Sequence, residues 1–351
     1  MPRNGLDAQT EVTVLMRAIL LDWMWYVHGK YRLNNETMHL AASIVDRFLS
    51  RAPLARPHLQ LLGVTALFVA TKHEECWCPS VDNLVRITDG AYTVRQVLSM
   101  EITILRVLKF KVSAPTPYHF LVHALRLMGT DERSWLGKCS MALLDRSLQE
   151  ADIWLGSKPL GWAKTGLEPA NAALPKSFNI IAVQATCVSP ESKALAALSG
   201  ALLALAGPRC VHPSGNPSAQ SSLGCVGISD EAFVRVPWRV PTSVAVALGC
   251  GTIHCILRAR EVGYKMLSLF EKWDSVNYTV DAPAIFTSCA YPLHSPKSQV
   301  TSVMKKYSHY RQGFTAVLLA AANEQLNITE DVLFDTQGLD GLEMNLKPTE
   351  G

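Results

Sequence analysis

Apolar residues recur at helical spacing through the first 155 residues of this 351-residue chain. Each segment with the pattern carries apolar side chains at i, i+3, i+4 and i+7, and none of them alternates as a strand would. We therefore predict an all-α fold for this part of the chain. The helices are expected at 16–28, 34–50, 58–75, 79–88, 93–110, 116–128 and 132–155.

The first of these helices has two apolar faces where a surface helix needs only one. One stripe is formed by Met16, Ile19, Leu20 and Trp23, and a second stripe on roughly the opposite side by Ala18, Leu21 and Trp25. The pattern alone favours a helix that packs on both faces. It leaves open whether one stripe instead faces a partner.

Charged residues interrupt several apolar faces and should therefore have partners. Glu101 lies at the edge of the apolar face of segment 93–110, and Lys72 at the end of segment 58–75 is its expected cation. Two interpretations stay open: an ion pair within the bundle, or a pair held ready for a partner protein. For Arg17 and Asp46 we predict a structural ion pair between the first two helices.

Composition and charge do not alter the predicted all-α fold, but they exclude some functions. A net charge of +3 without a basic stripe argues against nucleic acid or an anionic membrane as the partner. The most apolar run, 193–207, is shorter than the roughly 20 residues of a membrane span and should be a buried helix. The nine cysteines are scattered and odd in number, which is typical of free thiols in the nucleus and cytoplasm.

The chain carries none of the motifs that would make it an enzyme. There is no P-loop, no HExxH zinc motif and no nucleophile elbow. His73, Cys76 and Cys78 are close in sequence but lack a fourth metal ligand. We expect no catalytic residue, no cofactor and no metal.

Several segments resemble a known family. "MRAILLDWMWYVHGKYRLNNETMHLAASIVDRFLS", "LQLLGVTALFVATKHEE", "ITDGAYTVRQVLSMEITILRVLKF" and "PTPYHFL" are similar to the N-terminal cyclin box of A/B-type mitotic cyclins. The B-type branch is the closer one. The resemblance runs almost continuously over residues 12–155.

The resemblance implies the cyclin fold, which consists of two five-helix boxes. Residues 1–130 would be the first box and 131–155 the start of the second. The second box would then be degenerate or interrupted. It would contain an insertion or irregular segment at 156–188, a helix at 189–207, a poorly specified stretch at 208–296, and the last cyclin helix with a tail at 297–351. "KKYSH" within this last segment is similar to a family signature.

The family binds and activates a cyclin-dependent protein kinase and has no catalysis of its own. By resemblance, the kinase contacts would be Lys72, Glu74, Glu101, Leu105 and Phe110. An exposed apolar groove would dock Arg-x-Leu motifs of substrates or inhibitors, while the opposite stripe faces the core. That groove would be lined by Met16, Ile19, Leu20, Trp23, Leu59 and Gln60. These features imply control of the cell cycle at G2/M.

The sequence also departs from the family at a few positions. Tyr26 stands where an acidic or amide side chain is usual, and His73 replaces an aromatic kinase contact. The N-terminal destruction motif of the family is not seen, so a fragment or unusual isoform is expected. The alternative function is a helical adaptor, or a truncated isoform, that binds a kinase or docking-motif proteins without activation.

Overall fold

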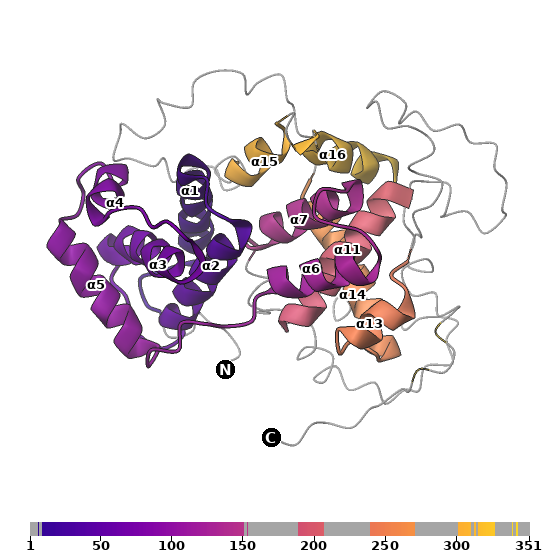
Figure 1. Cartoon of the computed structure of the whole chain (residues 1–351), viewed down its shortest axis with the longest axis horizontal. Coiled ribbons are helices and arrows are strands. Elements are labelled where there is room, and N and C mark those ends of the chain that lie inside the picture. Colours follow the sequence, from indigo (N-terminus) through magenta and orange to yellow (C-terminus); the bar gives the residue numbers. More distant parts are fainter. Residues whose placement is uncertain are drawn as a thin grey trace.

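The computed structural model describes residues 9–150, 189–206, 239–270, 301–309 and 315–326, together with a few isolated positions. All regular elements within these ranges are helices, as predicted (Figure 1). Nearly all are α-helices, and one short 3₁₀ turn, Arg56–His58, precedes α3. The α-helices are α1 (Val14–Tyr31), α2 (Asn35–Leu49), α3 (Leu59–Glu74), α4 (Val81–Ile87), α5 (Val94–Val107), α6 (Pro117–Leu127), α7 (Trp135–Ser147), α11 (Pro190–Ala206), α13 (Thr242–Ala247), α14 (Ile253–Ser268), α15 (Ser302–Tyr307) and α16 (Thr315–Gln325).

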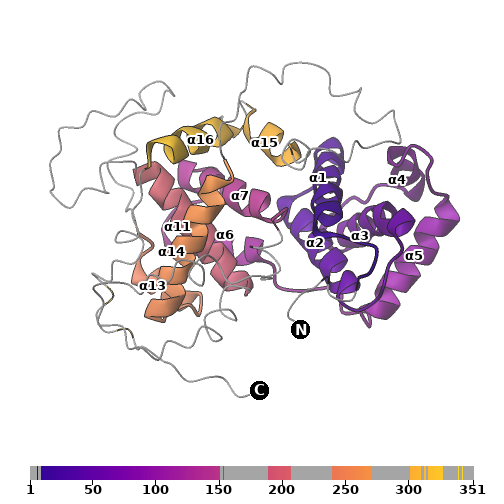
Figure 2. The same ribbon diagram turned by 180° about the vertical axis from the view of Figure 1, so that it is seen from behind.

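Helices α1 to α5 form an N-terminal unit around α3. The sequence of α3 is apolar almost all round, and residues 61–71 are all buried. Gly63 allows α1 to approach closely, because a Cβ atom at this position would lie 2.6 Å from Cδ1 of Leu20. α2 and α5 pack on other sides of α3, so the central helix has no free face (Figures 1 and 2).

Local signals place the ends of these helices. Thr93 caps α5 by accepting a hydrogen bond from the backbone N–H of Gln96, whose side chain bonds back to the N–H of Thr93. Thr13 and Ser80 cap α1 and α4 by accepting a backbone hydrogen bond, without the reciprocal bond seen at Thr93. Helix α1 ends at Arg32, which adopts the left-handed conformation with a φ of 53°.

A C-terminal unit is built around α11. This helix is buried, as the apolar run predicted, and it packs against α6, α7 and α14. Gly200 of α11 and Gly263 of α14 bring the two backbones together. A Cβ atom on Gly263 would lie 2.4 Å from the carbonyl oxygen of Ala196. Within the described helices, none has the length and apolar character to span a bilayer.

The predicted boundary at residue 130 is wrong. Helix α6 packs against α11 and α7, and Figure 1 shows it among the helices that follow it in the chain. Its buried side chains, Leu121, Ala124 and Leu125, belong to the second unit. The first unit therefore ends between α5 and α6, within residues 111–116, which have no regular secondary structure.

The prediction that 208–296 is irregular is also wrong for part of this range. Helices α13 and α14 lie within it, and α14 packs along α11. The apolar face of α14 is hard to recognise because Arg258 and Arg260 are themselves buried and Gly263 interrupts it. The expected last helix is shorter than its pattern and forms α15, with α16 following separately. The predicted segment 156–188 lies outside the described residues.

Candidate functional site

Lys72 and Glu101 form an ion pair at the surface of the N-terminal unit. Nζ of Lys72, at the end of α3, lies 2.6 Å from Oε1 of Glu101 in the middle of α5. The Lys72 ammonium also lies 3.9 Å from the ring centre of Phe68, one turn earlier on α3. The side chain of Glu101 is 14% exposed and that of Lys72 is 43% exposed. The predicted pairing is therefore present, and it faces solvent.

Exposed apolar side chains lie on α5, which carries Glu101, and just after it. Leu98 and Ile102 on α5 are 41% and 50% exposed, and Phe110, just after α5, is 72% exposed. Val97 and Ile104 point the other way and are fully buried. Helix α5 thus anchors one face in the core and presents a second, mixed apolar and acidic face to solvent.

The other predicted kinase contacts lie on α3 and α5 or just after α5. Leu105 is half-buried, one turn after Glu101 on α5. Glu74 accepts a hydrogen bond from Nδ1 of its neighbour His73, at 2.7 Å. Phe110 has a φ of 58°, an uncommon left-handed conformation for an aromatic residue, which turns the chain out of α5.

The predicted docking stripe is less exposed than expected. Leu20, Trp23 and Leu59 are buried, at 5%, 4% and 8% exposure, so the prediction of an exposed groove is wrong for these three. For Leu20 the reason is the close approach of α1 to α3 at Gly63. The half-buried members of the stripe are Met16, Ile19 and Gln60.

The opposite stripe of α1 also faces the interior. Leu21 and Trp25 are buried in the core, and Ala18 is half-buried. Helix α1 is therefore covered on both apolar faces, which is the interpretation that the pattern alone favoured. Tyr26, the departure noted above, is half-buried beside it.

The predicted Arg17–Asp46 ion pair is present and joins α1 to α2. Nε and one terminal nitrogen of Arg17 donate to the two oxygens of Asp46, at 2.6 and 2.8 Å. The second terminal nitrogen donates to the backbone oxygen of Leu148, at 2.9 Å. The Arg17 guanidinium is fully buried, and these bonds compensate its charge.

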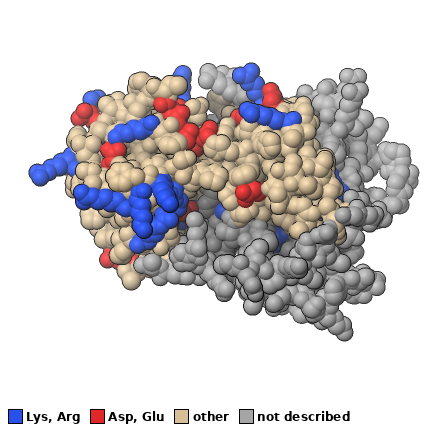
Figure 3. Space-filling model, turned by 60° about the horizontal axis from the view of Figure 1, so that its bottom comes forward, with Lys and Arg blue, Asp and Glu red and all other residues tan. Residues whose placement is uncertain are grey.

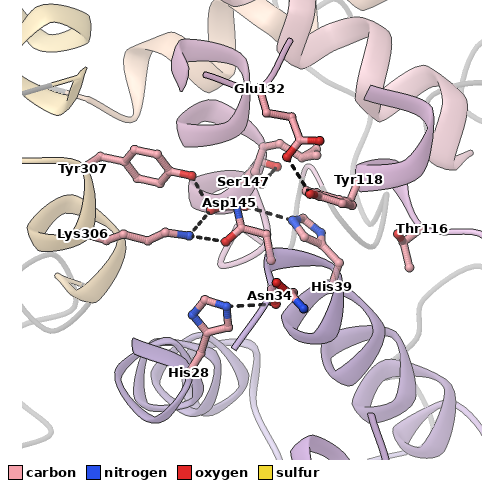
Figure 4. Close-up of polar contacts among 12 residues, drawn as sticks. His28, Asn34, His39, Thr116, Tyr118, Glu132, Asp145, Ser147, Lys306 and Tyr307 are labelled. Carbon is pink, nitrogen blue, oxygen red and sulfur yellow. Dashed lines mark hydrogen bonds and ion pairs between the residues drawn. The ribbon is translucent and has the colours of Figure 1, made fainter. Parts of the chain in front are cut away.

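A second polar cluster, centred on Asp145 of α7, joins the two units (Figure 4). Oδ1 of Asp145 accepts a hydrogen bond from Nε2 of His39 on α2, at 2.9 Å. Oδ2 accepts hydrogen bonds from Nζ of Lys306 and the hydroxyl of Tyr307, at 2.8 and 2.7 Å. We call these four residues the Asp145 cluster. It connects α2, α7 and α15.

Electrostatics explain how a carboxylate persists in this buried position. Burial alone would raise the pKa of Asp145, but the Lys306 ammonium and the hydrogen bond from His39 outweigh it and hold the pKa at about 2. Burial, followed by the Asp145 charge, raises the pKa of Tyr307 well above its usual value. Tyr307 therefore acts as a permanent hydrogen-bond donor.

Further contacts connect the two units beside the Asp145 cluster. Asp22 of α1 accepts hydrogen bonds from the backbone N–H of Ser302, at 2.8 Å, and from the side chain of Gln149, at 3.0 Å. The Lys306 ammonium lies 4.3 Å from the ring centre of Trp25 and donates to Asn35. Helix α15 is thus held by the N-terminal unit as well as by α7.

His28 is buried beside this joint. Its Nε2 donates to the backbone oxygen of Asn34, at 3.1 Å, and its ring packs edge-on against Trp25 with ring centres 5.0 Å apart (Figure 4). Burial, together with the nearby Lys306 charge, lowers the pKa of His28 to about 3. The imidazole is therefore neutral at physiological pH.

The sequence analysis missed the Asp145 cluster for two reasons. His39 shares the buried face of α2 with apolar residues, and Asp145 follows an apolar run on α7, so neither carried a distinct motif. The usable signals were the charge itself, which requires a partner when buried, and the "KKYSH" segment, which supplies Lys306 and Tyr307.

No metal centre is evident in the part of the chain that is described. It holds no group of three or more His, Cys, Asp and Glu side chains arranged for a metal ion. Cys76 is exposed, while the thiol of Cys78 lies 3.2 Å from the Thr71 hydroxyl.

Comparison with known proteins identifies the N-terminal unit. Residues 1–113 match the family model described as "Cyclin, N-terminal domain". This segment is a cyclin domain. The match ends where α5 gives way to α6, which agrees with the boundary between the two units. The predicted resemblance to the cyclin family, in its B-type, G2/mitotic branch, is thereby confirmed.

Curated relatives of the cyclin domain include B-type and other G2/mitotic-specific cyclins. Cyclin-B1-3 of Arabidopsis thaliana is 45% identical over 132 residues, which are 38% of this chain and 32% of that protein. G2/mitotic-specific cyclin-B1 of Oryzias javanicus is 45% identical over 151 residues, or 43% and 37% of the two chains. G2/mitotic-specific cyclin S13-7 of Glycine max is 43% identical over 131 residues, or 37% and 51%.

The chain therefore spans between about a third and a half of the length of these relatives. Among solved structures, a viral cyclin from herpesvirus saimiri is similar over 76% of this chain and 93% of its own, with 19% identity and a TM-score of 0.47.

Proposed function

We propose that this chain is a regulatory subunit that binds and activates a cyclin-dependent protein kinase and acts in the cell cycle at G2/M. The observation that carries the proposal is the solvent-facing Lys72–Glu101 pair, located within a cyclin domain whose relatives are mitotic cyclins. This pair supports the second of the two interpretations that the sequence left open, a pair held ready for a partner.

The surroundings of the pair suit a protein interface. Leu98 and Ile102 expose apolar area on the helix that carries Glu101, and Phe110 does so just after that helix. Interfaces commonly combine an apolar centre with polar groups at the rim. In the proposed complex the paired Lys72 and Glu101 side chains hydrogen-bond the kinase backbone.

Activation in this proposal is indirect, because the chain supplies no catalytic group. The kinase carries its own lysine–glutamate pair, metal ions and catalytic aspartate, and activation consists of bringing them into place. Leu105, one turn after Glu101 on α5, and Glu74, two residues after Lys72 at the end of α3, would extend the surface that presses on the kinase.

We further propose that the chain recruits substrates or inhibitors carrying Arg-x-Leu motifs. The accessible part of the docking stripe consists of Met16, Ile19 and Gln60, which are half-buried on α1 and α3. Leu20 and Trp23 of the same stripe are buried and would not contact the motif directly. Tyr26 lies one turn further along α1, where the Arg of such a motif would be read.

The nucleus and cytoplasm are the compartments proposed for this function. All five cysteines in the described segments are free thiols, which suits a reducing compartment: Cys76, Cys78, Cys139, Cys250 and Cys255.

The test is co-purification of the full chain with a cyclin-dependent kinase, followed by a histone phosphorylation assay of the complex. Kinase capture together with increased phosphorylation supports the proposal. Capture without activation would favour the adaptor alternative, for which the short family match, residues 1–113, is the supporting observation. Absence of capture would overturn the kinase-activating function and leave only an adaptor that binds docking-motif proteins.

A further inference from the structure

A cluster of cationic side chains lines a hollow at the C-terminal ends of α2 and α5. The hollow has a volume of about 280 Å³, and its lining residues are Arg47, Arg51, Val107, Leu108, Lys109 and Lys111. Four of these six side chains are cationic and none is acidic. Figure 3 shows Lys and Arg side chains gathered on one side of this part of the molecule.

The charges are not compensated from within the described chain. Arg47 uses its guanidinium to donate to the backbone oxygens of Lys111 and Val112. The side chains of Arg51, Lys109 and Lys111 have neither an acidic partner nor a hydrogen bond in the described segments. Burial lowers the pKa of Arg47, and the nearby positive charge of Arg51 lowers it further.

Helix ends account for only part of this charge. Two helices end here, and the C-terminus of a helix carries roughly half a negative charge. Arg47 already satisfies carbonyl groups of the following loop. The remaining three cations, on Arg51, Lys109 and Lys111, therefore exceed what the helix ends require and leave a net positive hollow.

The backbone organises this hollow. Lys109 and Phe110 both have positive φ values, 52° and 58°, which is uncommon for residues other than glycine. The resulting turn places Lys109 and Lys111 in the lining, while Phe110 projects into solvent. Arg47 holds the far side of the turn through its two bonds. The positions of the two lysines are therefore determined by the fold.

We propose that this hollow binds a phosphate group carried on a peptide, so that the chain recognises phosphorylated proteins. A phosphorylated side chain carries a charge of about −1.5 to −2 and three acceptor oxygens, which matches the three unpaired donors. The volume is below the range of about 300–1,000 Å³ of typical small-ligand pockets. Val107 and Leu108 give the hollow an apolar floor for the residue next to the phosphate.

Other anionic partners fit less well. A nucleic acid or a lipid surface needs charges spread along a stripe or a plane, and the chain carries a net charge of only +3. A carboxylate peptide would offer a single charge and two oxygens to the same three donors. In a phosphorylated peptide, a single phosphate group can pair with the cations of Arg51, Lys109 and Lys111 together.

The experiment measures binding of fluorescent random-sequence peptides to the full chain, without kinase. One pool carries a central phosphoserine, a second the unmodified serine and a third an aspartate. We expect the phosphoserine pool to bind at least about tenfold more tightly than the other two. The double variant Lys109→Ala/Lys111→Ala should remove this preference, and Arg51→Ala should weaken binding about tenfold. Lys30→Ala and Arg95→Ala, at exposed positions outside the hollow, are the matched controls.

Several results would overturn the inference. These are equal binding of all three pools, a phosphoserine preference that survives in the double variant, or absence of binding. Duplex DNA or phosphatidylserine vesicles that bind more tightly than the peptides, with the same dependence on Lys109 and Lys111, would assign the hollow to a different partner. Since no kinase is present, this result is independent of the kinase-activation test.

Discussion

His39 of α2 donates a hydrogen bond to Asp145 of α7 across 106 positions of sequence, and both side chains are fully buried. The bond crosses the boundary between the two helical units. With Lys306 and Tyr307 on the other carboxylate oxygen, a single buried charge connects three segments. The stability of the chain should therefore depend on Asp145 more than on any surface charge.

The first prediction replaces Asp145. Asp145→Ala removes the carboxylate that pairs with the Lys306 ammonium and accepts from His39 and Tyr307, and the free energy of unfolding should fall by about 3–5 kcal/mol. Chemical denaturation of the full chain measures this. The control Glu150→Gln removes an exposed acid paired with Arg146 at 3.0 Å and should cost at most about 1 kcal/mol. Equal losses for the two variants would contradict the central role of Asp145.

The second prediction concerns pH and His28. Its pKa is about 3 in the folded chain, against an ordinary value of 6.5. Between these values the unfolded chain binds a proton that the folded chain does not, so stability is lost as the pH falls below 6.5. The slope from this residue approaches about 1.4 kcal/mol per pH unit.

The measurement is the free energy of unfolding from pH 7.5 to 5. His28→Leu should flatten this dependence, at a cost of about 1 kcal/mol at pH 7.5 for the lost bond to Asn34. His58→Leu, at an exposed position, should leave the slope unchanged. An unchanged slope in His28→Leu would show that other groups cause the acid sensitivity.

The third prediction tests the crossing of α11 and α14. In Gly263→Ala the new methyl group would collide with backbone atoms of Ala196 and Gly200, which cannot move aside as a side chain can. The free energy of unfolding should therefore fall by about 1–3 kcal/mol. Gly29→Ala is the matched control, because nothing lies within 4 Å of that position, and it should be neutral or slightly stabilising. A Gly263→Ala variant as stable as the parent would mean that the two helices do not pack this closely.

The fourth prediction addresses kinase binding. Because the Lys72–Glu101 pair is solvent-facing, Lys72→Ala and Glu101→Ala should each change the unfolding free energy by no more than about 1 kcal/mol. At a kinase interface each should weaken binding by about 30-fold or more, equivalent to about 2 kcal/mol. Lys30→Ala is the control. Variants that lose stability in proportion to binding would indicate a purely structural pair, and unchanged binding would remove both residues from the interface.

The fifth prediction concerns substrate docking. Trp23→Ala is an unsuitable probe, because this buried residue should cost about 3–5 kcal/mol of stability when truncated. Met16→Ala and Gln60→Ala alter half-buried positions and should leave kinase binding intact. They should lower phosphorylation of substrates with an Arg-x-Leu motif about fivefold or more, while substrates without the motif are unaffected. Equal effects on both substrate types would sink the docking proposal.

The sequence was sufficient where a charged residue interrupted an apolar helix face. Glu101 on an apolar face had to find a cation, and Arg17 and Asp46 interrupted adjoining stripes, so both pairs were predictable from helical spacing. The same spacing predicted all seven helices of the first 155 residues. The two-faced α1 was recognised as unusual for the same reason.

The sequence was insufficient where the burial or the partners of a side chain depend on which helix packs against its own. Periodicity showed that Leu20 and Trp23 share a stripe, but not that both are buried, which for Leu20 follows from the closeness of α3 at Gly63. The partners of Asp145 come from α2 and α15, and no spacing rule connects them. Helix α14 was missed because buried arginines and a glycine obscure its apolar face, although Gly263 is what allows it to pack on α11.

The distance along the chain between Asp145 and Lys306 has a consequence for synthesis. The two residues are 161 positions apart. At translation rates of about 5–20 residues per second, roughly 8–30 s pass between the addition of Asp145 and that of its cation. During this interval the nascent chain holds α2 and α7 without the ammonium that stabilises the carboxylate. The contacts that α15 adds between the two units can therefore form only late in synthesis, after α11 and α14 have been made.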